Sequence, residues 1–217
     1  MGSTPTADGF HSTASRKETF HTLSLVEPHL RPGDIVLDVG CGSAYVTWQL
    51  AQRHAGAVLA VDIVDIRKKS TPHFALYDGI ELPFDDESVD MVMLNFVLHH
   101  IPNDIKPRAI AEVRRVTRRA MFVAEDTPRN FIDRYFNRRH GEEFRRRIGS
   151  DAEYGFYDQS TWEAWFEAQG FTVVQSLSLG RFSREWREPF ARSCFVLDKS
   201  RAVPVTTAGE AMGAMPG

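Results

Sequence analysis

The amino-acid sequence predicts an α/β fold built around a parallel sheet, and two observations carry that prediction. The first is the apolar run Ile35–Val39, which ends in Gly40 and Gly42 and passes directly into a helical pattern. The second is another apolar run, Ala57–Ile63, one helix later. Strand, helix and strand in this order form a βαβ unit, whose crossover should be right-handed.

Length and composition are those of one ordinary globular domain. The chain has 217 residues, of which 42% are hydrophobic and 25% charged, enough for a proper core. The net charge of −3 gives no sign of a nucleic-acid or membrane partner. Cys41 and Cys194 form neither a disulfide framework nor a metal cluster. With no secretory signal or bilayer-spanning run apparent, we expect a cytoplasmic protein.

The domain is expected to span residues 15–199, between a flexible N-terminus (1–14) and a disordered tail (200–217). The segment Ser15–Glu18 has capping-box spacing and predicts a helix that ends near Pro28. After the first strand, residues 46–51 keep helical spacing, and Gly56 is the expected end of that helix.

The turn after the first strand has the features of a ligand site. Gly40 and Gly42 allow backbone angles that side chains forbid, so a ligand can approach the main chain there and at Cys41 between them. Asp38 lies at the carboxyl end of the strand, where an open parallel sheet binds its ligands. A carboxylate there would repel a pyrophosphate and suits a cationic ligand. A dinucleotide fingerprint is excluded, because it needs glycine at Tyr45. The alternative is a glycine turn without a ligand.

The first turn resembles that of the class I S-adenosylmethionine-dependent methyltransferases. Their motif, acid-x-Gly-x-Gly-x-small, is met by Asp38, Gly40, Gly42 and Ala44. The family usually has a third glycine where this chain has Ala44. The segments Leu82–Asp90 and Asn95–Pro102 resemble the small single-domain, UbiE-like (type 11) subgroup, and the resemblance covers residues 15–125 through such motifs.

The resemblance implies S-adenosyl-L-methionine as the cofactor. It also implies a Rossmann-like, mostly parallel sheet of seven strands with helices on both faces and an antiparallel last strand. A helical insert is expected after the fifth strand, at about residues 129–157.

Polar side chains follow the next strands as well. Asp62 ends the second strand 20 residues after Gly42, a spacing that suits hydrogen bonds from both ribose hydroxyls. The resemblance assigns Asp62 the same role, with Ile63 beside it.

The third strand, Phe74–Tyr77, is followed by Asp78 and Gly79, which in the resembled family lie at the adenine amino group. The alternative is an Asp-Gly turn selected only for its backbone angles. The resemblance places Asn95, at the end of the fourth strand, Met91–Asn95, near the methionine part and the methyl group.

Transfer of the methyl group is an in-line displacement, so the protein supplies binding, alignment and exclusion of water. A base for a hydroxyl or amine acceptor is the remaining need. His100 is the first candidate, followed by His99, Glu125 and His140, and one of the two adjacent histidines should face the site. A structural role for both is the alternative. No His/Cys/Asp cluster shows metal-ligand spacing, so no metal is expected.

The insert is expected to shape the substrate site. Between Arg129 and Ile148 it carries seven arginines against three acids, interleaved with aromatic residues. Such a combination can bind a carboxylate, a phosphate or a planar acidic ring. We assign Arg138, Arg139 and His140 to substrate binding. The alternative is an amphipathic helix whose arginines face water.

The remaining elements complete the fold. A helix is expected over 104–117, and the fifth strand over 121–124. A capping box at Ser160–Glu163 should open a helix that stops at Gly170. Two apolar segments, 171–179 and 193–197, are the last strands, joined by a polar loop at 181–189.

The sequence therefore predicts a methyltransferase acting on a small molecule, with an acidic or phenolic metabolite as the favoured substrate. Two alternatives remain. An RNA methyltransferase would use the basic and aromatic insert, although the total charge is negative. A non-catalytic protein would bind the cofactor without transferring its methyl group. The oligomeric state stays open.

Overall fold

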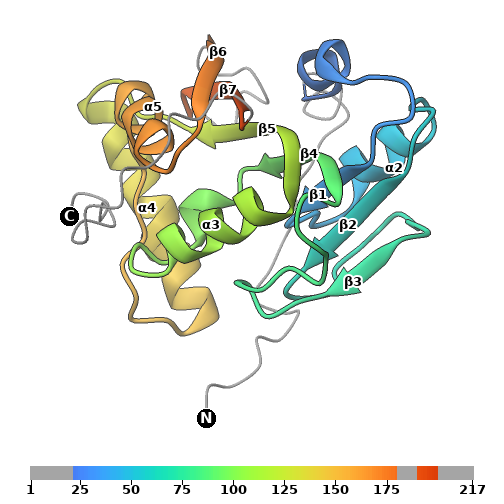
Figure 1. Cartoon of the computed structure of the whole chain (residues 1–217). Helices are drawn as coiled ribbons and strands as arrows, with labels where there is room; N and C mark the ends of the chain where they lie inside the picture. Colours follow the sequence, from blue (N-terminus) through green and yellow to red (C-terminus); the bar gives the residue numbers. More distant parts are fainter. Residues whose placement is uncertain (1–21, 180–189, 200–217) are drawn as a thin grey trace.

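The computed structural model describes residues 22–179 and 190–199, which form one seven-stranded sheet of order β3-β2-β1-β4-β5-β7-β6 (Figure 1). The strands are β1 (Val36–Val39), β2 (Val58–Asp62), β3 (Phe74–Leu76), β4 (Val89–Asn95), β5 (Thr117–Asp126), β6 (Thr172–Leu179) and β7 (Arg192–Asp198). The first five strands pair in parallel, and β7 is antiparallel to β5 and β6. The predicted mixed sheet is confirmed.

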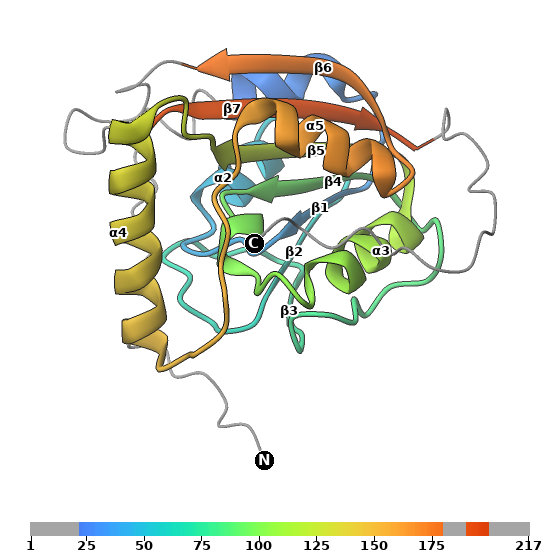
Figure 2. The same ribbon diagram turned by 90° about the vertical axis from the view of Figure 1, so that its left-hand side faces the viewer.

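Helices cover both faces of the sheet. They are α2 (Tyr45–Ala51), α3 (Lys106–Val116), α4 (Phe131–Ile148) and α5 (Gln159–Ala168), with the short 3-10 helices η2 (Glu27–His29) and η3 (Leu98–His100). In Figure 2, α3 and α5 lie on one face and α2 on the other. None of the described helices is long and apolar enough to cross a membrane.

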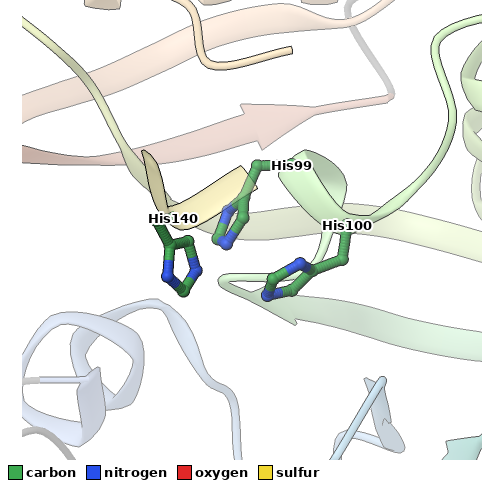
Figure 3. A group of neighbouring side chains, drawn as sticks. All are labelled: His99, His100 and His140. Carbon is green, nitrogen blue, oxygen red and sulfur yellow. The ribbon is translucent and has the colours of Figure 1, made fainter. Parts of the chain in front are cut away.

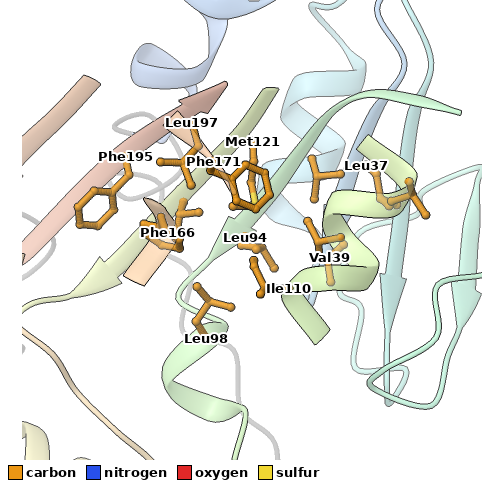
Figure 4. Close-up of a cluster of buried hydrophobic side chains, with 14 of the residues drawn as sticks. Leu37, Val39, Leu94, Leu98, Ile110, Met121, Phe166, Phe171, Phe195 and Leu197 are labelled. Carbon is orange, nitrogen blue, oxygen red and sulfur yellow. The ribbon is translucent and has the colours of Figure 1, made fainter. Parts of the chain in front are cut away.

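Alternation along the strands builds two cores. Leu37 points to the α3 and α5 side, where it joins a buried cluster with Ile110 and Phe166 (Figure 4). Val36 points the other way and packs in the cluster that contains Leu50 of α2. Successive strand residues face opposite sides of a sheet, and each large apolar side chain buried this way stabilises the fold by about 1.5–3 kcal/mol.

Helix α4 carries the segment predicted as an insert. It begins at Asn130, whose side-chain oxygen accepts hydrogen bonds from the Ile132 and Asp133 amides, and it ends at Gly149 in the left-handed conformation (φ 65°). Figure 2 shows α4 standing across the carboxyl ends of β4 and β5. The helix therefore lies beside the edge of the sheet where α/β folds bind ligands.

Three expected boundaries were wrong. Helix α2 already ends at Ala51, with Gln52 as its C-cap; Gly56 instead lets the chain pass the Asp34 carbonyl, which a Cβ at residue 56 would approach to 1.9 Å. The N-cap of α5 is Asp158, not Ser160, because the Asp158 carboxylate accepts the Thr161 amide at 2.9 Å. Strand β5 is longer than expected, because it pairs with β4 on one side and β7 on the other.

Several expectations fall outside the described residues. These are the flexible N-terminus, the start of the first helix at residue 15, the loop 181–189 and the tail 200–217.

Candidate active site

The glycine turn after β1 is shaped by close backbone packing. Gly40 has φ 71°, and its amide donates to the Val61 carbonyl at 2.9 Å. A Cβ at Gly40 would lie 2.7 Å from Cγ2 of Val97, so no side chain fits. Gly42 (φ 53°) and Ala44 (φ 58°) are also left-handed. A left-handed alanine costs about 1–2 kcal/mol, which explains why glycine suits the third position of this turn.

Asp38 lies on β1, directly beneath the turn, and is buried. Its Oδ2 accepts a hydrogen bond from Thr47 Oγ1 at 2.6 Å. Its Oδ1 is buried and has no hydrogen-bond partner among the described residues. Burial raises the pKa of Asp38 to about 7; the Thr47 hydrogen bond and the facing Asn95 amide oppose this increase, and the charge of Asp62 adds to it.

Asp62 ends β2 beside this turn. Its two oxygens accept the amides of Gly42 and Ile63, both at 2.8 Å. Burial raises its pKa, and these amide hydrogen bonds oppose the increase. Gly79 approaches from the end of β3, where a Cβ would lie 3.3 Å from the Ile63 side chain. Cys41 lies between the glycines, and burial raises the pKa of its thiol.

Asn95 ends β4, the strand beside β1. Both polar atoms of its amide are buried and, within residues 22–179 and 190–199, neither has a hydrogen-bond partner. Asp78 is different, because it is exposed and its Oδ1 accepts the amides of Ile80 and Glu81 at 2.8 and 2.7 Å. These bonds lower the pKa of Asp78. The predicted cofactor residues thus gather at the carboxyl ends of β1, β2 and β4, and Asp78 lies on the surface after the end of β3.

A buried carboxylate fixes the segment that follows β4. Glu125 of β5 accepts the Leu98 amide through Oε1 at 2.7 Å. Its Oε2 lies 2.5 Å from Nδ1 of His99. Both side chains are almost fully buried. Glu125, predicted as a candidate base, therefore fixes η3 and the His99 ring instead of facing an open space.

The two adjacent histidines do not divide between the site and the core. Figure 3 shows His99, His100 and His140 close together, two from η3 and one from α4. The ring centroids of His99 and His100 lie 4.1 Å apart, and that of His140 lies 5.9 and 5.7 Å from them. Burial holds the pKa of His100 well below its usual value. The sequence did not reveal this histidine cluster, because its third ring comes 40 residues downstream on another element.

The arginines of α4 border a hollow of about 300 Å³. Its lining residues are Pro128, Arg134, Asn137, Arg138, Gly141, Glu142, Arg145, Tyr154 and Phe156. Asn137 is buried, and its amide has no hydrogen-bond partner in the described part of the chain. Arg138 lines the hollow while pairing with Glu142 at 2.8 Å.

The three residues predicted to bind the substrate, Arg138, Arg139 and His140, therefore lie in three different surroundings. Arg139 lies within 5.9 Å of the Tyr135 ring and does not line the hollow, whereas His140 joins the histidine cluster. Sequence reasoning missed Asn137, since one polar residue in a polar helix carries no signal.

Part of the chain matches known methyltransferases. The family model for a methyltransferase domain matches residues 37–123, which run from β1 into β5. This stretch carries a methyltransferase domain, and the comparisons support a class I S-adenosylmethionine-dependent methyltransferase. Asp38, Gly40 and Gly42 are the residues of its first turn that carry the resemblance.

Two curated relatives of this methyltransferase domain match in part. Demethylmenaquinone methyltransferase of Symbiobacterium thermophilum is 30% identical over 48% of this chain and 46% of its own length. Probable tRNA methyltransferase 9B of Mus musculus is 31% identical over 40% of this chain and 20% of its own length. The chain thus spans half or less of the length of these relatives.

A solved structure of another methyltransferase has a similar fold over most of this chain. It is the 1,6-didemethyltoxoflavin-N1-methyltransferase of Burkholderia thailandensis, with bound 1,6-didemethyltoxoflavin and S-adenosylhomocysteine. It matches with a TM-score of 0.66 at 17% identity, over 85% of this chain and 79% of that one.

Proposed function

We propose that this chain binds S-adenosylmethionine along the edges of β1, β2 and β4 and methylates a small, acidic or phenolic molecule. The observation that carries the proposal is a set of buried polar atoms at adjoining strands, Oδ1 of Asp38 and the amide of Asn95, which face each other and have no other hydrogen-bond partner among the described residues. A buried polar group without a partner costs about 1–3 kcal/mol. A ligand with donors and an acceptor at this place recovers that cost.

The charges fit this cofactor. Asp38 and Asp62 are two carboxylates at neighbouring strand edges, and they suit the cationic methionine part and the ribose hydroxyls of the cofactor. The exposed Asp78 is left for the adenine amino group. When bound, the cofactor supplies an electrophilic methyl group. The residues of the chain bind it, align it and exclude water.

The acceptor is proposed to bind between the histidine cluster and the hollow of α4. Phe156 belongs to both places, because it stacks on His99 with ring centroids 4.9 Å apart and also lines the hollow. Arg134, Arg138 and Arg145 outnumber Glu142, the acid in the lining of the hollow, and this excess of positive charge favours an anionic acceptor. Of the candidate bases, His99 is the best oriented, since Glu125 fixes its Nδ1 and leaves Nε2 to take a proton.

An RNA acceptor is the second candidate. The same three arginines and the exposed aromatic residues of α4, among them Phe131 and Tyr135, are ingredients of a nucleic-acid surface. Retention on heparin that falls steeply with salt, together with methylation of an RNA pool, would favour this candidate.

Cofactor binding is tested by titration calorimetry with S-adenosylmethionine and S-adenosylhomocysteine. We expect binding with one site per chain, weakened about tenfold or more by Asp62→Asn. Asp104→Asn removes an exposed carboxylate and is the matched control, with affinity unchanged. The absence of binding by the parent chain would overturn the proposal.

The acceptor class is tested with labelled cofactor. Small acceptors are offered in matched anionic and neutral forms, with parent chain and Arg134→Gln compared. We expect faster labelling of anionic acceptors, and a loss of that preference in the variant. Equal rates for both forms in the parent chain would contradict the proposed substrate class.

A further inference from the structure

The three imidazole rings of the histidine cluster converge on one point. One ring nitrogen from each of His99, His100 and His140 lies within 4.8 Å of the other two. Around a tetrahedral zinc ion, histidine nitrogens lie about 2.0–2.1 Å from the metal and therefore about 3.4 Å from one another. Binding of one ion therefore requires the rings to draw closer together than they lie in this structure.

Glu125 gives His99 the partner that metal-binding histidines have. A histidine that binds a metal through one ring nitrogen usually donates a hydrogen bond from the N–H of the other ring nitrogen to a carboxylate. This bond fixes the ring and makes the first nitrogen a better ligand. The 2.5 Å contact between Glu125 Oε2 and His99 Nδ1 leaves Nε2 of that ring as the ligand atom. The Leu98 amide holds the other oxygen of Glu125 in place.

Each ring of the cluster also contacts a phenylalanine. Phe156 stacks on His99, Phe144 lies 4.1 Å from His100, and Phe190 lies 5.5 Å from His140, measured between ring centroids. An apolar shell of this kind limits water around a metal site and strengthens the electrostatic effect of the ion.

We propose that His99, His100 and His140 bind a divalent transition-metal ion, with zinc as the first choice, and that Glu125 positions His99 for it. Imidazole ligands suit zinc, copper, nickel and iron. Three histidines leave the fourth position of a tetrahedral ion for water or for a substrate atom, the pattern of catalytic zinc sites.

A role for the ion in acceptor activation rests on the proposed function and takes the place of the base there, because Nε2 of His99 binds either the ion or a proton. The ion would lower the pKa of a hydroxyl acceptor bound at its fourth position. The hydroxyl proton passes to solvent, and the oxygen then forms a bond to the methyl carbon while the carbon–sulfur bond breaks. The products are a methyl ether and the neutral thioether form of the cofactor.

The test uses the full chain, stripped with a chelator and titrated with Zn²⁺ by calorimetry, and with Co²⁺ by visible spectroscopy. We expect one ion per chain and an intense visible band, typical of tetrahedral Co²⁺. His140→Gln should abolish the band, and His73→Gln, which changes an exposed histidine elsewhere, should leave it unchanged. Glu125→Gln keeps all three ligands, and the affinity should fall about 10- to 100-fold.

Two results would overturn the inference: the absence of stoichiometric uptake by the parent chain, or the same affinity in the His140→Gln variant. Circular dichroism shows whether that variant is folded. Hydrogen exchange gives an independent readout in the parent chain, because an ion that joins η3 to α4 must slow exchange along α4. Metal uptake needs no cofactor, and cofactor binding is measured after chelation, so failure of the proposed function can be told apart from failure of the metal site.

Discussion

Glu125 and His99 form a buried pair in which the carboxylate oxygen Oε2 lies 2.5 Å from Nδ1 of the ring. The two residues are 26 positions apart in the sequence and come from β5 and η3. Because Oε1 also accepts the Leu98 amide, one side chain fixes both the backbone and the first ring of η3. Glu125 is therefore a positioning residue for the histidine cluster.

Glu125→Gln should change the tautomer of His99. The glutamine amide can accept only one of the two hydrogen bonds, so the domain should lose about 1–3 kcal/mol of unfolding free energy and the Nδ1 proton of His99 should move to Nε2. Urea unfolding and nitrogen NMR of the imidazole measure these effects. The exposed Glu81→Gln is the control. An unchanged tautomer would show that Glu125 does not fix the ring.

Gly40→Ala should cost more stability than Gly149→Ala. Both glycines are left-handed, at φ 71° and 65°, so each alanine incurs a backbone cost of about 1–2 kcal/mol. A Cβ at Gly149 meets nothing within 4 Å, whereas one at Gly40 lies 2.7 Å from Val97. Gly149→Ala is therefore the matched control.

Val97→Ala combined with Gly40→Ala should recover part of the additional loss, because it removes the atoms that clash. Unfolding free energies of the four chains give the coupling between the two positions. Additive effects would contradict the proposed clash.

The sequence predicted the sheet, and it placed Asp62 at the glycine turn, because these signals are local. Asp38, Gly40 and Gly42 lie within five residues, and Asp62 follows at a spacing set by one βαβ unit. Strand alternation and turn residues determine such features without knowledge of distant contacts.

The histidine cluster and the hollow beside α4 could not be predicted in the same way. His140 meets His99 and His100 only because α4 crosses the carboxyl ends of the strands, and no sequence period encodes that crossing. Asn137 becomes informative only when its burial is known. The N-cap of α5 is Asp158 and not the predicted Ser160, because two residues that can cap a helix lie two positions apart and the sequence alone did not decide between them.

Arg192→Met should strongly destabilise the domain. Asp126 and Arg192 are opposite each other in the β5–β7 pairing and form a buried ion pair at 3.0 Å. Removing the arginine leaves a buried carboxylate without its cation, at a cost of about 3–5 kcal/mol. Chemical denaturation measures the loss, and addition of Asp126→Leu should recover much of it.

A surface pair provides the control for this experiment. The side chains of Arg138 and Glu142 pair at 2.8 Å but are 81% and 53% exposed. Arg138→Met should therefore change the unfolding free energy by less than about 0.5 kcal/mol. Equal losses at the two arginines would contradict the importance of burial.

Asp38→Asn should make the domain more stable than the parent chain at alkaline pH. Burial raises the pKa of Asp38 from 3.8 to about 7 in the folded protein, so between these values the folded state holds a proton that the unfolded chain has lost. The stability of the parent chain must therefore fall as pH rises through this range, by up to about 4 kcal/mol in total.

The variant cannot titrate at position 38 and should lack this decline. Its unfolding free energy relative to the parent chain should rise by about 2–3 kcal/mol between pH 5 and pH 8, as measured by urea unfolding at each pH. The same variant should bind S-adenosylmethionine at least about tenfold more weakly, because it removes a carboxylate from the proposed site of a cation. A stability difference that stays constant from pH 5 to pH 8 would show that Asp38 is already ionised at pH 5 in the folded protein, and would contradict the raised pKa.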